Sequence, residues 1–178
     1  LSAPVDGGTV IGTSFADHMQ GSQAADWLHG RDGNDVLIGG EGADVLEGEE
    51  GDDLLEGDAG NDRLYGGAGV NVLRGGEGSD LLVSNAAADQ LIGGTGHDIY
   101  HLVSGLATVS EDANGGIDTI QLAPSASLAF QAPDQVENVQ ILDDFYLEPT
   151  QRVDLVGNVL DNQLSGRNQL DGQGGNDI

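Results

Sequence analysis

Aspartate returns every nine residues along the first half of the chain. Residues 12–101 divide into ten consecutive nonapeptides without insertion, and the sixth position is Asp in nine of them. The first position is Gly in nine of the ten, and the fourth is Gly in seven. Carboxylates and backbone carbonyls are the oxygen ligands that hard cations prefer, and glycine allows the positive φ values that turn several carbonyls of a short loop toward one ion. The spacing therefore indicates a series of cation sites.

Position eight of each nonapeptide is apolar, which predicts the element that carries each turn. The last three residues of a repeat suit a short β-strand, and the middle side chain of such a strand points to one face. Nine residues thus form one ion-binding turn and one strand, and the apolar side chain lies in the core. The position-eight residues are Met19, Leu28, Leu37, Leu46, Leu55, Leu64, Leu73, Leu82, Leu91 and Tyr100.

The charge of the chain limits its partners. The formal net charge is −26, and the five basic residues are all arginine. Nucleic acids and acidic membrane surfaces need a basic patch, so cations are the expected partners. The 30 glycines disfavour long helices, and no apolar run is long enough to span a membrane. With no cysteine, disulfides cannot hold the fold.

The nonapeptides resemble the glycine- and aspartate-rich repeat of the RTX family, the hemolysin-type calcium-binding proteins. Repeats such as GGEGADVLE and GGEGSDLLV carry the resemblance, which covers residues 12–101 and resumes at GQGGNDI, residues 172–178. It implies an all-β fold, a right-handed parallel β-roll of nonapeptide repeats followed by a β-rich capping segment. In such a roll two nonapeptides make one coil, so equivalent turns on one edge are two nonapeptides apart.

The resemblance also implies which atoms bind calcium. Each ion lies between a turn and the equivalent turn two nonapeptides later. The first turn offers the carbonyls of positions two and four and its Asp, and the second offers the carbonyls of positions one and three and its Asp. Ten turns give eight such pairs, so up to about eight Ca²⁺ ions are expected. The candidate metal-site residues are Thr13, Phe15, Asp17, Ser22, Ala24, Asp26, Gly30, Arg31, Asp32, Gly33, Asp35, Gly39, Gly40, Glu41, Gly42, Asp44, Gly48, Glu49, Glu50, Gly51, Asp53, Gly57, Asp58, Ala59, Gly60, Asp62, Gly66, Gly67, Ala68, Gly69, Asn71, Gly75, Gly76, Glu77, Gly78, Asp80, Ser84, Ala86, Asp89, Gly93, Thr95 and Asp98.

Some repeats depart from the pattern. Asn71 is a neutral ligand and should weaken the sites that it joins. The repeat at residues 84–92 has no glycine, so we expect its turn to bind calcium poorly. The first two repeats lack Gly at positions two and four, and we expect an irregular start of the roll with partial occupancy. Asp98 is expected to be the last aspartate of the series and to belong to a single site.

Beyond the repeats the nine-residue phase stops and later returns. We divide the chain into a lead-in at 1–11, the calcium-binding roll at 12–101, a β-rich cap or non-calcium continuation at 102–156, and the start of a second repeat block at 157–178. Glu111, Asp112 and Asp118 could form a further ion site, although a solvated loop is favoured. Because the chain stops at Ile178, inside a repeat, we expect a piece of a longer protein.

The resemblance implies a function without catalysis in this part of the chain. The sequence contains no EF-hand, P-loop or nucleophile-elbow motif, and His97 and His101 lie on a turn and strand rather than a helix. The expected function is a module that folds on binding calcium outside the cell and supports the secretion and stability of a larger type I secreted bacterial protein. The alternatives are a calcium-dependent polysaccharide-binding or adhesive module, or the C-terminal part of a secreted enzyme such as a protease or epimerase.

Overall fold

The structure is a computed structural model, and every element in its described residues is a β-strand. It describes residues 1–3, 6–86, 88–103, 107–111, 115–123, 128–142, 153–158, 163–165 and 170–171. Within these ranges no helix has the length and apolar character needed to cross a membrane.

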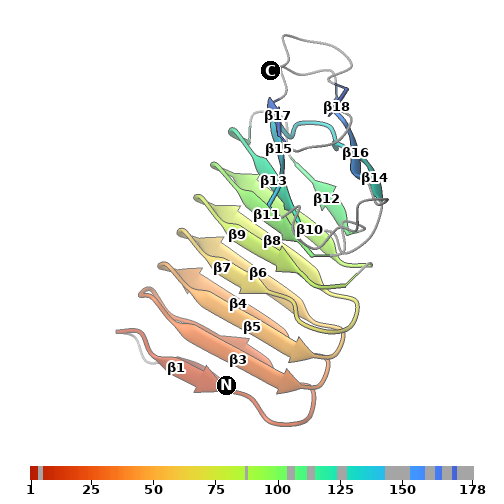
Figure 1. The fold of residues 1–178 in the computed structure, drawn as a ribbon. Coiled ribbons are helices and arrows are strands. Elements are labelled where there is room, and N and C mark those ends of the chain that lie inside the picture. Colours follow the sequence, from red (N-terminus) through yellow and green to blue (C-terminus); the bar gives the residue numbers. More distant parts are fainter. Residues whose placement is uncertain are drawn as a thin grey trace.

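Successive strands alternate between two parallel sheets that face each other along the length of the roll (Figure 1). In the described residues the larger sheet has nine strands and the facing sheet has six. The nine strands, in spatial order, are β1 (Thr9–Ile11), β3 (Trp27–Asp32), β5 (Val45–Glu50), β7 (Arg63–Tyr65), β9 (Leu81–Ser84), β11 (Ile99–Leu102), β13 (Thr119–Leu122), β15 (Asn138–Ile141) and β17 (Gln163–Ser165). The six strands are β2 (His18–Gln20), β4 (Val36–Glu41), β6 (Leu54–Ala59), β8 (Val72–Glu77), β10 (Gln90–Thr95) and β12 (Thr108–Ser110).

The strand register confirms the predicted coil of two nonapeptides. Leu28 of β3 pairs with Leu46 of β5, and Leu37 of β4 pairs with Leu55 of β6. Each strand therefore lies beside the strand that follows two nonapeptides later. A chain that alternates between two parallel sheets in this way is a parallel β-roll, as expected from the sequence.

The core is a stack of the position-eight side chains between the two sheets. All ten, from Met19 to Tyr100, are fully buried. Their neighbours at positions seven and nine are partly or fully exposed, because successive side chains of a strand point to opposite faces. Each buried leucine contributes about 1.5–3 kcal/mol of apolar burial. One large side chain per nonapeptide is a thin core, so the roll depends strongly on what its turns contribute.

Positions two and four of the turns adopt the left-handed backbone conformation that the glycine pattern predicted. Gly40 has a φ of +103° and Gly42 a φ of +131°. At position two the conformation persists without glycine, with φ values of +80° at Arg31, +76° at Glu49 and +70° at Asp58. This conformation costs a non-glycine residue roughly 1–2 kcal/mol, so the fold imposes it for a reason other than local preference.

Strands after residue 102 extend the roll with a changed spacing. Ile99 of β11 pairs with Thr119 of β13, which pairs with Asn138 of β15. The first of these steps is two positions longer than a pair of nonapeptides, and the second is one position longer. A three-stranded parallel sheet also follows, in the order β14 (Leu128–Gln131), β16 (Val153–Val156) and β18 (Leu170–Asp171). The final block at residues 172–178 lies outside the described residues.

Candidate metal sites

The position-six side chains form two columns that run along the roll. In each column the Oδ1 atom of one residue accepts a hydrogen bond from the backbone N–H of the equivalent residue one coil earlier, as from Asp44 to Asp62 at 2.7 Å and from Asp35 to Asp53 at 2.8 Å. We call these the aspartate columns. The first, in the turns that lead into the six-stranded sheet, contains Asp17, Asp35, Asp53, Asn71 and Asp89. The second, in the turns that lead into the nine-stranded sheet, contains Asp26, Asp44, Asp62, Asp80 and Asp98.

The second carboxylate oxygen of most column residues is buried without a hydrogen-bond partner among the described residues. These side chains are at most 3% exposed. Removing an ionised carboxylate from water costs several kcal/mol unless a charge or hydrogen bonds compensate for it. A buried oxygen of this kind is therefore suited to bind a cation. The unpartnered atoms are Oδ2 of Asp35, Asp44, Asp53, Asp62, Asp80 and Asp98.

The glycine at position one leaves space beside each unpartnered oxygen. A Cβ atom on Gly39 would lie 2.5 Å from Asp44 Oδ2 and 2.8 Å from the carbonyl oxygen of Gly57, so both oxygens line the same space. The next coil of that column repeats this arrangement. A carboxylate and a backbone carbonyl from successive coils are ligands that calcium prefers. The turn residues therefore fit calcium, and a side chain at position one would fill the space.

Burial raises the pKa of the column carboxyl groups. The pKa of Asp44 and that of Asp53 rise to about 6, and that of Asp62 rises to about 7, chiefly because burial disfavours the charged form. Neighbouring carboxylates of the same column add to the rise, and the hydrogen bond from the backbone N–H opposes it. The columns thus hold negative charge that a cation would stabilise.

Three turns satisfy their aspartate with a hydroxyl group instead. In each, Oδ2 of the aspartate accepts a hydrogen bond from a Ser or Thr near the start of the same turn. These turns also lack the left-handed residues of the others among the described positions. The pairs are Thr13–Asp17 at 2.9 Å, Ser22–Asp26 at 2.8 Å and Ser84–Asp89 at 2.7 Å.

The hydroxyl group stabilises the charged aspartate in part, as a bound cation would. The backbone N–H and the hydroxyl of Thr13 lower the pKa of Asp17, whereas the pKa of Asp35, the next residue in its column, is raised by burial. These turns are the ones that the sequence marked as irregular. Their residues remain candidate ligands, now with an aspartate oxygen that already has a partner.

We expect the hydroxyl to stabilise its turn directly. Ser22→Ala removes the hydrogen bonds of this hydroxyl and leaves Oδ2 of the buried Asp26 with one donor, the backbone N–H of Ser22 at 2.7 Å. The free energy of unfolding at saturating calcium should fall by about 1–3 kcal/mol. Urea unfolding followed by circular dichroism measures it, and Ser22→Thr, which keeps the hydroxyl, is the matched control. Equal stability of the Ala and Thr variants would contradict the role of the hydroxyl.

Asn71 weakens the first column by more than the loss of one negative charge. Its Oδ1 accepts the backbone N–H of Asp53 at 2.9 Å, which directs Nδ2 to the position that Oδ2 has in the other turns. This Nδ2 is buried and has no partner among the described residues. An amide nitrogen is not a calcium ligand, so this turn lacks the side-chain oxygen that the others offer.

The second column continues beyond Asp98, so the prediction that Asp98 ends the series is wrong. The backbone N–H of Asp98 donates to Asp118 Oδ1 at 2.8 Å, and that of Asp118 donates to Glu137 Oε2 at 2.8 Å. The regular phase of the nonapeptides places neither residue in the column because the coils become longer here, and the sequence suggested Asp118 only as part of a separate ion site. The pair Gly115–Gly116 followed by Asp118 is the signal that was available in the sequence.

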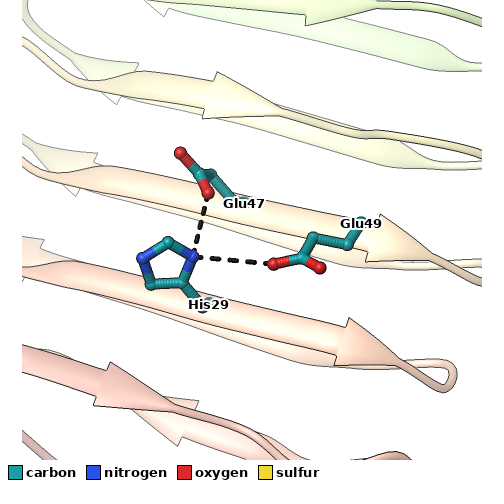
Figure 2. Close-up of polar contacts among 3 residues, drawn as sticks. All are labelled: His29, Glu47 and Glu49. Carbon is teal, nitrogen blue, oxygen red and sulfur yellow. Dashed lines mark ion pairs between the residues drawn. The ribbon is translucent and has the colours of Figure 1, made fainter.

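Other acidic residues lie on the outer faces of the sheets rather than in the columns. Figure 2 shows His29 of β3 between two glutamates of β5, with Nδ1 2.9 Å from Glu47 Oε2 and 3.6 Å from Glu49 Oε1. On the other sheet, Arg74 pairs with Glu56 at 2.7 Å. The candidate ligand at Glu49 is its carbonyl oxygen, which accepts a hydrogen bond from the backbone N–H of Ala68 at 2.7 Å. A histidine and an arginine therefore engage part of the acidic surface.

The comparisons with known proteins agree with this geometry. The family model described as the RTX calcium-binding nonapeptide repeat matches four stretches of the chain, at residues 11–46, 38–73, 65–100 and 164–178. Together these stretches cover more than half of the 178 residues. No match was found among curated proteins. With its nonapeptides arranged as a parallel β-roll, the chain belongs to the RTX family of calcium-binding repeat proteins.

Proposed function

We propose that this calcium-binding roll is a folding module of a larger secreted bacterial protein, and that calcium outside the cell triggers its folding. The observation that carries the proposal is the set of buried, unpartnered aspartate oxygens in the two columns. The sites join residues of successive coils, so they do not exist in an open chain, and binding is then linked to folding.

The strongest sites of the regular type lie where both turns have left-handed residues and an aspartate with an unpartnered oxygen. Two kinds of site are weaker. In turns where a Ser or Thr hydroxyl binds the aspartate, one carboxylate oxygen already has a partner. In the turn of Asn71, the corresponding atom is a nitrogen. We therefore propose fewer strong ions than the eight pairs of turns. The strong pairs are Asp35 with Asp53, Asp44 with Asp62, Asp62 with Asp80, and Asp80 with Asp98.

The link to secretion follows from the difference in calcium between compartments. Free calcium is low in the cytosol, and extracellular calcium-binding modules have affinities of about 10⁻⁴–10⁻³ M. Without calcium, the −26 charge and the buried carboxylates oppose folding, which keeps the chain open for export. The proposed localisation is extracellular or at the cell surface, with residues 12–101 as the calcium-dependent part and later strands as its continuation.

Removal of calcium should unfold the roll. We expect a circular dichroism spectrum of a largely unfolded chain in EGTA and a β-sheet spectrum in millimolar calcium, since the thin core alone does not offset the entropy of ordering the chain. Magnesium at the same concentration is the control, because it requires a tighter octahedral geometry and keeps its water. A β-sheet spectrum that is equally strong in EGTA would disprove the proposed trigger.

A further inference from the structure

Three carboxylates converge where the second column meets the changed repeat. Asp98 precedes β11, Glu111 follows β12 and Asp118 precedes β13, so they come from both sheets. One ligand oxygen from each lies within 4.8 Å of those of the other two. Asp98 and Asp118 are each 1% exposed. Asp112, which the sequence suggested as part of a further site here, lies outside the described residues. The cluster lies one coil beyond the eight pairs of turns that the regular nonapeptides define.

Asp98 supplies an independent sign that the cluster takes a ligand. Its Oδ1 accepts the backbone N–H of Asp80 at 2.8 Å, whereas its Oδ2 is buried and has no partner in the part of the chain that the structure describes. The charge of the Asp98 carboxylate therefore has no compensating partner among the described residues on the side of Oδ2.

Glu111 occupies the place that a glycine holds in the regular turns. Strands β10 and β12 pair with Ile92 opposite Ser110, so the following residues, Gly93 and Glu111, are equivalent positions one coil apart. In the regular turns the oxygen beside position one is a glycine carbonyl of the next coil, whereas beside Gly93 it is the side-chain oxygen of Glu111. A Cβ on Gly93 would clash with Asp98 Oδ2 and with this oxygen. The carboxylate thus points into the space where a regular turn offers a carbonyl.

Tyr100 completes the surroundings of the cluster. Its side chain is fully buried, and its hydroxyl donates a hydrogen bond to Glu111 Oε1. His97 lies nearby on the exposed side, but its Nδ1 accepts the backbone N–H of Ile117 at 2.8 Å. The ligand atoms that point into the cluster are therefore all oxygen, which favours a hard cation over zinc.

We propose that Asp98, Glu111 and Asp118 bind a further calcium ion that closes the calcium-binding part of the roll. This inference rests on the proposed calcium-dependent folding, and it adds a site with three carboxylates to the regular sites with two. Because affinity for calcium increases with the number of charged ligands, this site fills first. It joins the last strand of the six-stranded sheet to the next strands of the nine-stranded sheet, where the glycine pattern has ended.

Calcium titration of Glu111→Gln tests the site. We expect the dissociation constant of the tightest ion, measured by calorimetry, to rise about tenfold or more. Asp52→Asn is the matched control: it removes one negative charge from an exposed residue outside the candidate sites, and it should leave the tightest ion unchanged. If both variants bind the tightest ion as the natural chain does, the inference is wrong.

Terbium luminescence gives a second readout that does not require the Glu111 variant to fold. Terbium is a hard cation of similar size to calcium, and a tyrosine close to the ion excites it. The first equivalent of Tb³⁺ should be luminescent in the natural chain and lose most of its signal in Tyr100→Phe. An unchanged signal would place the first ion elsewhere and overturn the inference. If calcium does not fold the natural chain at all, the proposed function fails; if it does but the Glu111 and Tyr100 variants behave as the natural chain, only this site fails.

Discussion

Without calcium, the chain is expected to gain β-sheet structure when the pH is lowered from about 8 to about 5. In the fold, the pKa of Asp44, Asp53 and Asp98 is about 6 and that of Asp62 is about 7, against 3.8 for an ordinary aspartate. At about pH 5 the folded state therefore binds protons that the unfolded chain has released. Protons then remove the buried charge that calcium would otherwise compensate.

The direction of the pH dependence follows from the raised pKa values. The contribution of these groups to stability is complete below the unfolded pKa of 3.8 and is lost as the pH rises through about 6 to 7. The measurement is circular dichroism in EGTA across this range. At about pH 5 the chain is still above its isoelectric point of about 4.1 and keeps a negative charge.

A pair of triple variants separates the columns from the overall charge. Replacing Asp44, Asp62 and Asp98 by Asn removes three of the titrating groups and should flatten the pH dependence in EGTA. Replacing three exposed acids of the turns by Gln removes the same charge and should leave the dependence steep; these acids are Glu41, Glu50 and Glu77. Equal pH profiles of the two triple variants would show that general repulsion, rather than the columns, governs acid folding.

Changes within a column should move the calcium midpoint of folding in both directions. Asp62→Asn keeps an Oδ1 that accepts the backbone N–H of Asp44, but it replaces the unpartnered oxygen by nitrogen, as in Asn71. We expect the midpoint to rise about tenfold, because affinity depends on charged ligands. Asp62→Ala should raise it further, since the buried N–H of Asp44 also loses its acceptor, at a cost of about 1–3 kcal/mol.

The reverse change supplies an oxygen where the first column lacks one. Asn71→Asp keeps the acceptor for Asp53 and replaces the buried Nδ2 by a carboxylate oxygen, so the calcium midpoint should fall. Asp52→Asn is the matched control for both experiments, because Asp52 is exposed and lies outside the columns. Its Oδ1 accepts the N–H of Val70 at 2.8 Å, which Asn can also do. A midpoint that rises in Asn71→Asp would contradict the assignment of the columns.

The sequence predicted the roll because its determinants repeat. Every nonapeptide places an apolar residue at position eight, and Leu28 pairs with Leu46 at the separation of two nonapeptides that the resemblance to the RTX family implied. The continuation after Leu102 could not be predicted in the same way. There the turns change length, so Asp118 and Glu137 fall out of phase although their hydrogen bonds continue the column.

The candidate sites, too, could be predicted from the sequence only in part. The glycine positions predicted the left-handed turns, and even non-glycine residues such as Asp58 adopt that conformation. What the sequence could not show is the partner of each aspartate oxygen. Ser22 and Ser84 appeared only as losses of glycine, whereas in the fold their hydroxyls bind Asp26 and Asp89. Which atom of the Asn71 amide faces the site likewise depends on the hydrogen bond that its Oδ1 accepts from Asp53 in the preceding coil.

The pairing of each strand of the roll only with the strands one coil away has a mechanical consequence. Force applied along the axis of the roll passes through the coils in series, so the weakest interface between coils determines the load that the whole roll can carry. The strands of the roll are only three to six residues long, and each interface therefore contains few hydrogen bonds. Ions held in columns along the two edges would act as cross-links parallel to the load. The interface between Asn71 and Asp89, where one column has no unpartnered oxygen, is then the place where extension begins.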